Sequence, residues 1–432
     1  MGSPPGHAAA ADLACIVGRE FAVAPVPAWA LSDATEWAGV RGHAEVLVRP
    51  AGTGEVSRVL AWCHERGVPV TPRGGGTGFA GGCSPDGGVV LALDRLDRVE
   101  SVEPETWRMR VGAGVTTATV RRLARENGLH FPPDPGAAES SQIGGNVATN
   151  AGGPHTLGFG PTRRWVTGVE AVLASGELLE ARSLHRDVAG YDLAGLLCGS
   201  EGTLAVITAV ALRLVPWTEP DPPMLSFFDD AAAGAAAAAA VLAEGQQPAV
   251  LDFVDGEALA AAPYPGAAGA GFALLIEGAQ LDGAVPAPDA WRWRDGISHA
   301  VAAQRGGKLS EDVTVPLARL AEMVEGTREI GERHDLGACS WGHAGDGIVH
   351  ATLMFDRADG AAAARAREAG DALFDLALAL GGTLSGEHGL GRLKAHRAED
   401  TLGRTTVTAM RAVKDALDPR GILNPGVKLP RG

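Results

Sequence analysis

The chain has few cysteines, and none of them is paired at a spacing suited to metal binding. Five cysteines are scattered over 432 residues, and no CxxC sequence occurs. An iron–sulfur cluster and a cysteine-rich zinc knuckle are therefore not expected. An odd number of scattered cysteines is typical of free thiols in a reducing compartment.

Long apolar runs and an excess of positive charge are also missing. No stretch approaches the ~20 apolar residues of a membrane-spanning helix. In a secretory signal the apolar region follows a basic stretch, but no basic stretch precedes the apolar residues near this N-terminus. The net charge of −15 gives no electrostatic footprint for nucleic acid. We expect a cytoplasmic protein with no membrane span and no nucleic-acid partner.

The remaining pattern divides the chain into four segments. Residues 41–216 alternate short Val-, Ile- and Leu-rich runs with stretches of helical spacing, which predicts an α/β or α+β domain. A proline-rich break at 216–223 precedes a second α+β domain, which we place at 217–380. Its first helix follows Asp229 or Asp230, either of which could cap it, and the runs LDFVD, FALLIEG, ACSWGH and IVHATLMF are its expected strands. An N-terminal segment, 1–40, and a C-terminal segment, 381–432, complete the chain. The Pro and Gly residues of the C-terminal segment suggest an extended tail that packs back on the body of the protein.

A glycine-rich run at residues 72–82 contains a formal GxGxxG match from Gly76 to Gly81. A dinucleotide-binding turn needs a helix after the glycines, but here another strand-like run, VVLAL, follows. Glycines can instead let successive backbone amides form an anion-binding nest. Residues 132–153 form a second loop of this character. The two loops together predict one large ligand between them, with a diphosphate on the amides.

A pair of histidines flanks the sequence Asp346-Gly347 in the second domain. Asp-Gly between two strand-like runs favours a two-residue type I′ hairpin turn, which would place His343 directly opposite His350. The run GEHG adds Glu387 and His388, with small residues on both sides. Two imidazoles and a carboxylate with open positions suit Zn²⁺ or Mn²⁺ acting as a Lewis acid.

At these same motifs the sequence resembles the FAD-linked oxidases of the vanillyl-alcohol-oxidase type. The resemblance rests on PRGGGTGFAGG, IGGNVATNAGGPHTLGFG, YDLAGLLCGSEGTLAVIT, GHxGDGxxH and EHG, and it covers roughly residues 40–430. The branch with D-lactate, D-2-hydroxyglutarate and glycolate dehydrogenases is the more similar one. The resemblance implies an α+β protein with a two-part PCMH-type FAD-binding domain and an α+β cap domain with an antiparallel sheet.

The resemblance also assigns residues to FAD along its length. It places the pyrophosphate at Arg73, Gly74, Gly75, Gly76, Thr77, Gly78 and Gly82. It places the flavin and ribityl chain at Pro135, Ser140, Ser141, Gly144, Gly145, Asn146 and Asn150. The adenosine half is placed at Glu201, Gly202 and Ile207, and the flavin ring at Asn424. Some family members attach FAD covalently through a histidine in or beside the glycine loop. The loop here holds only Gly, Thr, Phe and Ala, so non-covalent FAD is expected.

The implied reaction oxidises a D-2-hydroxy acid to the 2-oxo acid by hydride transfer from Cα to flavin N5. By resemblance, His343, His350 and Glu387 bind a divalent metal that chelates the substrate, and His388 is the general base. Arg294, with Lys308 as a second candidate, would bind the substrate carboxylate. No iron–sulfur or haem motif is present, so electrons would leave to an external acceptor: a quinone, an electron-transfer flavoprotein, a partner subunit or O₂.

Three other functions fit parts of the sequence. A flavin oxidase of a specialised pathway, acting on another alcohol with O₂, is one, because VPLAR lacks an Arg directly after VP and Ile348 stands where family members often have Asn. A non-catalytic flavin subunit of a dehydrogenase complex is the second, although it would be expected to lack the His and Glu set. An alkyl-transfer lyase is the third, but its branch resembles HHG where this chain has Glu387.

Overall fold

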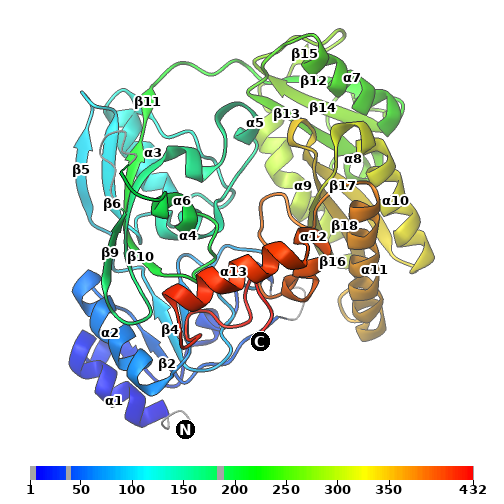
Figure 1. Ribbon diagram of the computed structural model, residues 1–432. Helices are drawn as coiled ribbons and strands as arrows, with labels where there is room; N and C mark the ends of the chain where they lie inside the picture. Colours follow the sequence, from blue (N-terminus) through cyan, green and yellow to red (C-terminus); the bar gives the residue numbers. More distant parts are fainter. Residues whose placement is uncertain (1–5, 36–39, 182–188, 432) are drawn as a thin grey trace. The chain divides into compact units, whose positions relative to one another are not determined.

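The computed structural model describes residues 6–35, 40–181 and 189–431. The chain forms two compact units (Figure 1), which are described separately. Unit 1 comprises residues 1–153, 161–218 and 388–432, and unit 2 comprises residues 154–160 and 219–387. Residues 36–39 of the expected N-terminal segment lie outside the described residues. The segment boundaries at 40, 216 and 380 stay predictions.

Unit 1 contains two larger sheets. The first has the order β1-β2-β4-β3 and joins β1 (Ala22–Val23), β2 (Val46–Val48), β4 (Val89–Ala92) and β3 (Val70–Arg73), with β2 and β3 both parallel to β4. The second is antiparallel, in the order β5-β6-β10-β8-β9, and consists of β5 (Val99–Glu103), β6 (Arg108–Gly112), β10 (Val206–Arg213), β8 (Val166–Val172) and β9 (Leu178–Ala181). A short pair joins β11 (Val215–Pro216) to β7 (Leu129–His130).

The helices of unit 1 follow the predicted apolar spacing where the sequence showed it. The stretches of helical spacing, GEVSRVLAWCHERG and TTATVRRLARENG, correspond to α2 (Thr53–Arg66) and α3 (Thr117–Glu126), and α2 ends at Gly67 in the left-handed conformation. Leu13 of α1 (Gly6–Val17) and Leu60 of α2 are fully buried in one core with strands of the first sheet. The other helices are α4 (Ile143–Thr149), α6 (Leu193–Leu197), α12 (Ala398–Leu402) and α13 (Arg404–Leu417).

The C-terminal segment returns to the first sheet of unit 1, as its Pro and Gly pattern predicted. Val70 of β3 donates to Ile422 O and accepts from Asn424 N, so the segment runs alongside β3. The glycine run lies between β3 and β4, and no helix occurs anywhere in the fully described stretch from 74 to 88. The rejection of a Rossmann turn is therefore confirmed.

Unit 2 is built on one antiparallel sheet of seven strands in the order β15-β12-β14-β13-β17-β18-β16. These strands are β15 (Val285–Pro286), β12 (Met224–Phe228), β14 (Phe272–Glu277), β13 (Val250–Asp255), β17 (Gly337–His343), β18 (Ile348–Asp356) and β16 (Gly306–Thr314). The expected strands at LDFVD, FALLIEG, ACSWGH and IVHATLMF are β13, β14, β17 and β18.

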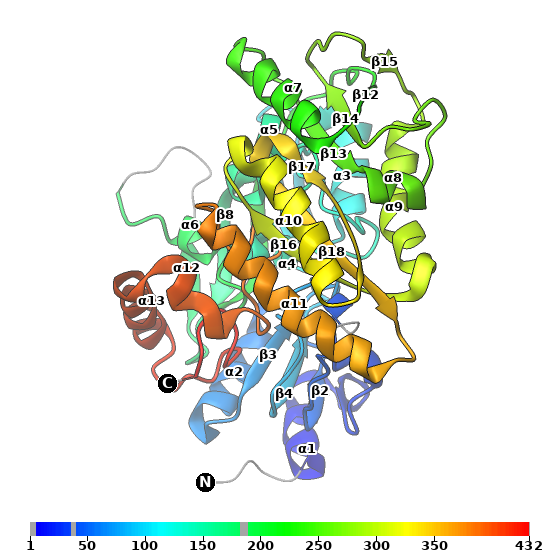
Figure 2. The ribbon, with the colours of Figure 1, turned by 90° about the vertical axis from the view of Figure 1, so that its right-hand side faces the viewer.

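Helices cover both faces of this sheet. On one face lie α7 (Ala231–Ala243), α10 (Leu320–Arg333) and α11 (Gly360–Ala379), as Figure 2 shows. Asp230 caps α7 by accepting a hydrogen bond from Ala233 N, as one of the two expected capping residues. On the other face, α8 (Gly256–Ala261) contributes Ala258 and Leu259, and α9 (Ala290–Arg305) contributes Ile297 and Val301, to one core with Trp341 and Met354. The short helix α5 (Thr156–Phe159) also belongs to unit 2.

Candidate active site

The hairpin of β17 and β18 brings the two histidines together, but not by the predicted turn. The strands are joined by residues 344–347, which form a short 3₁₀ turn and end at Gly347 in the left-handed conformation. His343 is therefore opposite Ile348, and His350 is opposite Trp341. The two-residue turn was wrong because the chain uses a four-residue loop, another common hairpin connection. His343 and His350 are diagonal neighbours on one face, with ring centres 5.6 Å apart.

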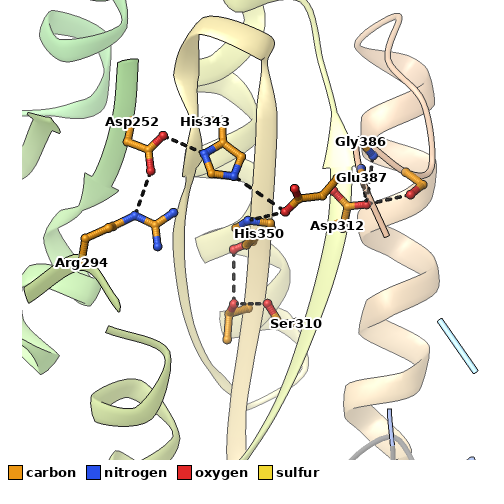
Figure 3. Close-up of polar contacts among 10 residues, drawn as sticks. Asp252, Arg294, Ser310, Asp312, His343, His350, Gly386 and Glu387 are labelled. Atoms are coloured by element: carbon orange, nitrogen blue, oxygen red, sulfur yellow. Dashed lines mark hydrogen bonds and ion pairs between the residues drawn. The ribbon is translucent and has the colours of Figure 1, made fainter. Parts of the chain in front are cut away.

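Glu387 completes a compact group of three possible metal ligands (Figure 3). Its Oε1 lies 3.7 Å from His343 Nε2 and 3.4 Å from His350 Nε2. One ligand atom from each of the three residues lies within 4.8 Å of the other two. Two imidazole nitrogens and a carboxylate oxygen at this spacing fit Zn²⁺ or another divalent transition metal. We call this group the His–His–Glu trio.

A buried carboxylate sets the orientation of His343. Asp252 on β13 is fully buried, and its Oδ1 lies 2.7 Å from His343 Nδ1. Burial disfavours the charged imidazole, but the Asp252 carboxylate and then Glu387 outweigh it and hold the pKa of His343 well above its ordinary value. Holding Nδ1 against a carboxylate fixes the ring and leaves Nε2 turned to Glu387, the usual second layer of a metal-bound histidine.

Arg294 shares this carboxylate with His343. It lies on α9, is 9% exposed, and its Nε donates to Asp252 Oδ2 at 3.0 Å. Burial raises the pKa of Asp252, but the charges of His343 and Arg294 hold it below its ordinary value. Figure 3 shows Arg294 and His343 turned to different oxygens of the Asp252 carboxylate. Asp252 thus connects a trio ligand to the guanidinium expected to meet a carboxylate.

A second buried carboxylate holds the loop that carries Glu387. Asp312 on β16 is fully buried, and its Oδ2 accepts hydrogen bonds from Ser385 Oγ, Gly386 N and Glu387 N at 2.7, 2.9 and 3.1 Å. Three donors on one oxygen fix the backbone immediately at Glu387, and through it the direction of the Glu387 side chain.

Replacement of Asp312 by alanine is expected to lower the free energy of unfolding by about 3 kcal/mol or more. It would leave three partly buried donors without their acceptor, and each such loss costs about 1–3 kcal/mol. Urea denaturation followed by circular dichroism measures the effect. The control is Asp289→Ala: this acid is exposed and makes no capping hydrogen bond, so a change within about 0.5 kcal/mol is expected. Equal effects of the two substitutions would contradict the anchoring role of Asp312.

Sequence reasoning missed both anchoring carboxylates. Asp252 is 91 positions from His343, and Asp312 is 75 positions from Glu387. The available signal was the presence of acidic residues within strands, since LDFVD contains Asp252 and Asp255 and SEDVTV contains Glu311 and Asp312. Buried acids are retained where they are paired or hydrogen-bonded, so each was a candidate for a structural partner.

Lys308 lies on the same face of the sheet as the trio. Lys308, Ser310 and Asp312 are two residues apart along β16, so their side chains share one face, and Asp312 is opposite His350. Its Nζ donates to Ser298 Oγ and lies 5.2 Å from the centre of the Trp341 ring. Burial lowers the pKa of Lys308 to about 8. Trp341 stands between this amine and His350, with a ring-centre separation of 6.2 Å from the imidazole.

In unit 1 the two glycine-rich loops lie against each other. A Cβ on Gly75 would fall 2.0 Å from Ser140 O, and one on Gly74 would fall 3.5 Å from Gly145 Cα. At Gly82 and Gly145, by contrast, an added Cβ would meet no atom within 4 Å. Close approach combined with open space beside the glycines fits a ligand running between the loops, as the sequence suggested.

Two buried acceptors in this region have no hydrogen-bond partner among the described residues: Gln142 Oε1 and Asn424 Oδ1. Gln142 precedes α4 and its Oε1 faces Gly74. Buried acceptors of this kind need a donor, and a flavin or ribityl group supplies donors. The residues present therefore fit FAD, and Gln142 is a residue that the sequence did not single out.

Several predicted FAD residues also support the loops. Arg73 is buried and donates to Ser32 O, Ser141 and Asn146 both hydrogen-bond Thr117, and Asn150 accepts from Arg163 N. A Cβ on Gly144 would fall 2.6 Å from Ala113 Cβ, so this glycine lets α4 pack closely. All the predicted FAD contacts stay predictions, including those of Thr77, Gly76, Gly78, Pro135, Gly202 and Ile207.

Glu201, Asn424 and His388 occur together in unit 1. Asn424 Nδ2 donates to Glu201 O and to Gly82 O, both at 2.8 Å. The Glu201 carboxylate accepts from Leu390 N and Gly391 N, just after His388. The His388 ring lies 4.8 Å from the ring of Phe79, in the glycine run.

None of the helices in the described ranges is long and apolar enough to span a bilayer.

Two family models match the chain. The "FAD binding domain" model matches residues 44–182, and the model for "FAD linked oxidases, C-terminal domain" matches residues 279–427. The glycolate oxidase subunit GlcD of Bacillus subtilis is 35% identical, with 88% of each chain covered. D-lactate dehydrogenase of Archaeoglobus fulgidus is 33% identical, covering 88% of this chain and 90% of the relative. D-2-hydroxyglutarate dehydrogenase of Xanthomonas citri pv. viticola is also 33% identical, with 88% of each covered.

Solved structures share the fold at lower identity. 4-Ethylphenol oxidase from Gulosibacter chungangensis has a TM-score of 0.78 at 18% identity and covers 99% of this chain and 98% of its own. p-Cresol methylhydroxylase has a TM-score of 0.77 at 15% identity, with 98% and 97% covered. These likenesses establish the α+β, PCMH-type fold expected from the sequence.

Proposed function

Because the chain belongs to the FAD-linked oxidase family, we propose that it is an FAD- and divalent-metal-dependent dehydrogenase that oxidises a small D-2-hydroxy acid to the 2-oxo acid. The observation that carries the proposal is the His–His–Glu trio, oriented by Asp252 on a face that also carries Arg294 and Lys308. The names of the relatives favour glycolate, D-lactate and D-2-hydroxyglutarate as first substrates to test.

The residues of unit 2 bind and orient the acid. His343, His350 and Glu387 would hold the metal, which supplies a Lewis acid that makes the substrate hydroxyl easier to deprotonate. Arg294 and Lys308 contribute positive charge for the carboxylate of the acid. Arg suits this role because its planar guanidinium can donate two parallel hydrogen bonds. The carboxylate of Asp252 keeps both His343 and Arg294 in place.

The residues of unit 1 hold FAD non-covalently and supply the base. Bound FAD would supply the electron sink for the oxidation of the substrate carbon. His388, the next residue after Glu387, takes the hydroxyl proton; imidazole has an ordinary pKa near neutrality, which suits a general base. Electrons then pass to an external acceptor, which we leave open among quinone, electron-transfer flavoprotein, partner subunit and O₂.

An anaerobic titration tests this function. The purified protein is mixed with a panel of D- and L-2-hydroxy acids while the visible flavin band is followed, with and without a chelator. We expect one D-acid to bleach the band, a chelator to abolish the bleaching, and added Zn²⁺ or Mn²⁺ to restore it. FAD-containing protein that no hydroxy acid bleaches would overturn the substrate assignment and favour an oxidase acting on another alcohol.

A further inference from the structure

Glu201 has an unusual environment for a residue expected to lie near the adenosine half of FAD. Its side chain is 4% exposed, and its backbone adopts the left-handed conformation with φ 54°. A non-glycine residue in this region is uncommon and is worth explaining. The backbone is fixed on both sides of the side chain, because Glu201 N donates to Ala148 O and Glu201 O accepts from Asn424.

The carboxylate of Glu201 accepts hydrogen bonds from the segment that follows His388 and pairs with Lys428. Oε2 accepts from Gly391 N at 2.7 Å, and Oε1 accepts from Leu390 N at 3.2 Å. Lys428 Nζ lies 3.1 Å from Oε1 and balances the charge. A Cβ on Gly389 would fall 2.7 Å from Oε1, so the carboxylate lies directly under the residue after His388.

The glycine run supports the same segment from another side. Arg392 N and Leu393 N donate to Ala80 O, and a Cβ on Gly391 would fall 1.8 Å from that oxygen. The neighbouring Phe79 is 53% exposed and its ring lies 4.8 Å from the His388 ring. The end of the glycine run and the Glu201 carboxylate thus hold residues 388–393 within unit 1.

From these contacts we propose that Glu201 is a positioning residue for the general base His388, which it holds through the backbone amides of Leu390 and Gly391. This inference rests on the proposed function, because it takes His388 as the base. It departs from the role implied by the family resemblance, since the carboxylate faces the base segment and its own lysine. A buried carboxylate with three donors fixes geometry well, and a displacement of about 1 Å in a catalytic group costs about 100-fold in rate.

The variant that tests the inference is Glu201→Gln. Glutamine offers one oxygen and a donating amide to a site with three donors, so one donor would face another. With loaded enzyme we expect turnover to fall about 100-fold, with KM and FAD affinity changed less than about threefold. Glu201→Asp, which keeps the charge, should recover part of the loss. The matched control is Glu170→Gln. Glu170 lies on β8 in the antiparallel sheet of unit 1, its side chain is 17% exposed, and it hydrogen-bonds Thr53 of α2, Thr208 and Arg110.

A second readout does not depend on activity. The rate at which diethyl pyrocarbonate modifies His388 is measured by peptide mass spectrometry, with the exposed His299 as internal reference. In Glu201→Gln this ratio should rise about fivefold or more as the segment loosens, and in Glu170→Gln it should not change. If Glu201→Gln does not fold, Lys428→Met decides the matter, since it removes only one of the three donors and should change the same ratio.

Two results would overturn the inference. One is an unchanged His388 modification rate together with unchanged turnover. The other is loss of FAD with an unchanged His388 modification rate, which would assign Glu201 to the cofactor. A wild-type enzyme that oxidises no hydroxy acid would contradict the proposed function, while the His388 modification rates would still decide whether Glu201 holds the segment.

Discussion

Replacement of Glu387 by glutamine is expected to lower turnover about a thousandfold and to release the divalent metal that we propose for the trio. Glu387 Oε1 faces both histidine Nε2 atoms, so its charge is the only carboxylate contribution to the trio. A Lewis acid stabilises the transition state by several kcal/mol, and each 1.36 kcal/mol corresponds to a factor of ten in rate. Stopped-flow flavin reduction measures the rate, and elemental mass spectrometry measures the metal.

Glu311→Gln is the matched control for this experiment. Glu311 is also buried, but it alternates with Asp312 along β16 and lies on the opposite face of the sheet from the trio. Its replacement should leave the metal content unchanged and the rate within about threefold. A Glu387→Gln enzyme that retained one metal per chain and near-normal turnover would show that the trio is not the metal site.

Replacement of His388 by alanine is expected to lower turnover by about 10²- to 10⁴-fold, the usual contribution of a general base, while metal and FAD contents stay unchanged. The two adjacent residues therefore separate two functions, since only the Glu387 variant should lose metal. Turnover and flavin absorbance are measured on the same sample. His299→Ala, at an exposed helix position, is the control. A loss of less than tenfold would rule out His388 as the base.

The identity of the trio could be predicted from the sequence although the pairing of its strands could not. The Asp-Gly signal predicted a loop two residues shorter than the one in the structure. A shift of two residues in the partner keeps each side chain on its face, whereas a shift of one would have turned His350 to the other side. The prediction of a shared site survived because the error was an even number of residues.

The anchoring residues could not be predicted, because local pattern carries no information about partners far along the chain. Asp252 and Asp312 lie in strand-like runs with a second acid nearby, and Glu201 lies in a glycine-containing stretch, so nothing local distinguishes their partners. Their partners are 91, 75 and 190 positions away. The strands and the helices α2 and α3 were predictable because their apolar spacing is local, and the glycine loops because their composition is extreme.

The return of the C-terminal segment to β3 has a consequence for the order in which this protein can assemble. Asn424 bonds Gly82 across 342 positions, and Leu423 lies beside Val70. While the chain is being synthesised, Val70 of β3 and the carboxylate of Glu201 lack their hydrogen-bond partners until residues 390–424 have been made. Unit 2, whose strands are made entirely before residue 388, can complete its sheet first. Unit 1, which contains the earliest residues of the chain, is thus the unit expected to complete its folding last.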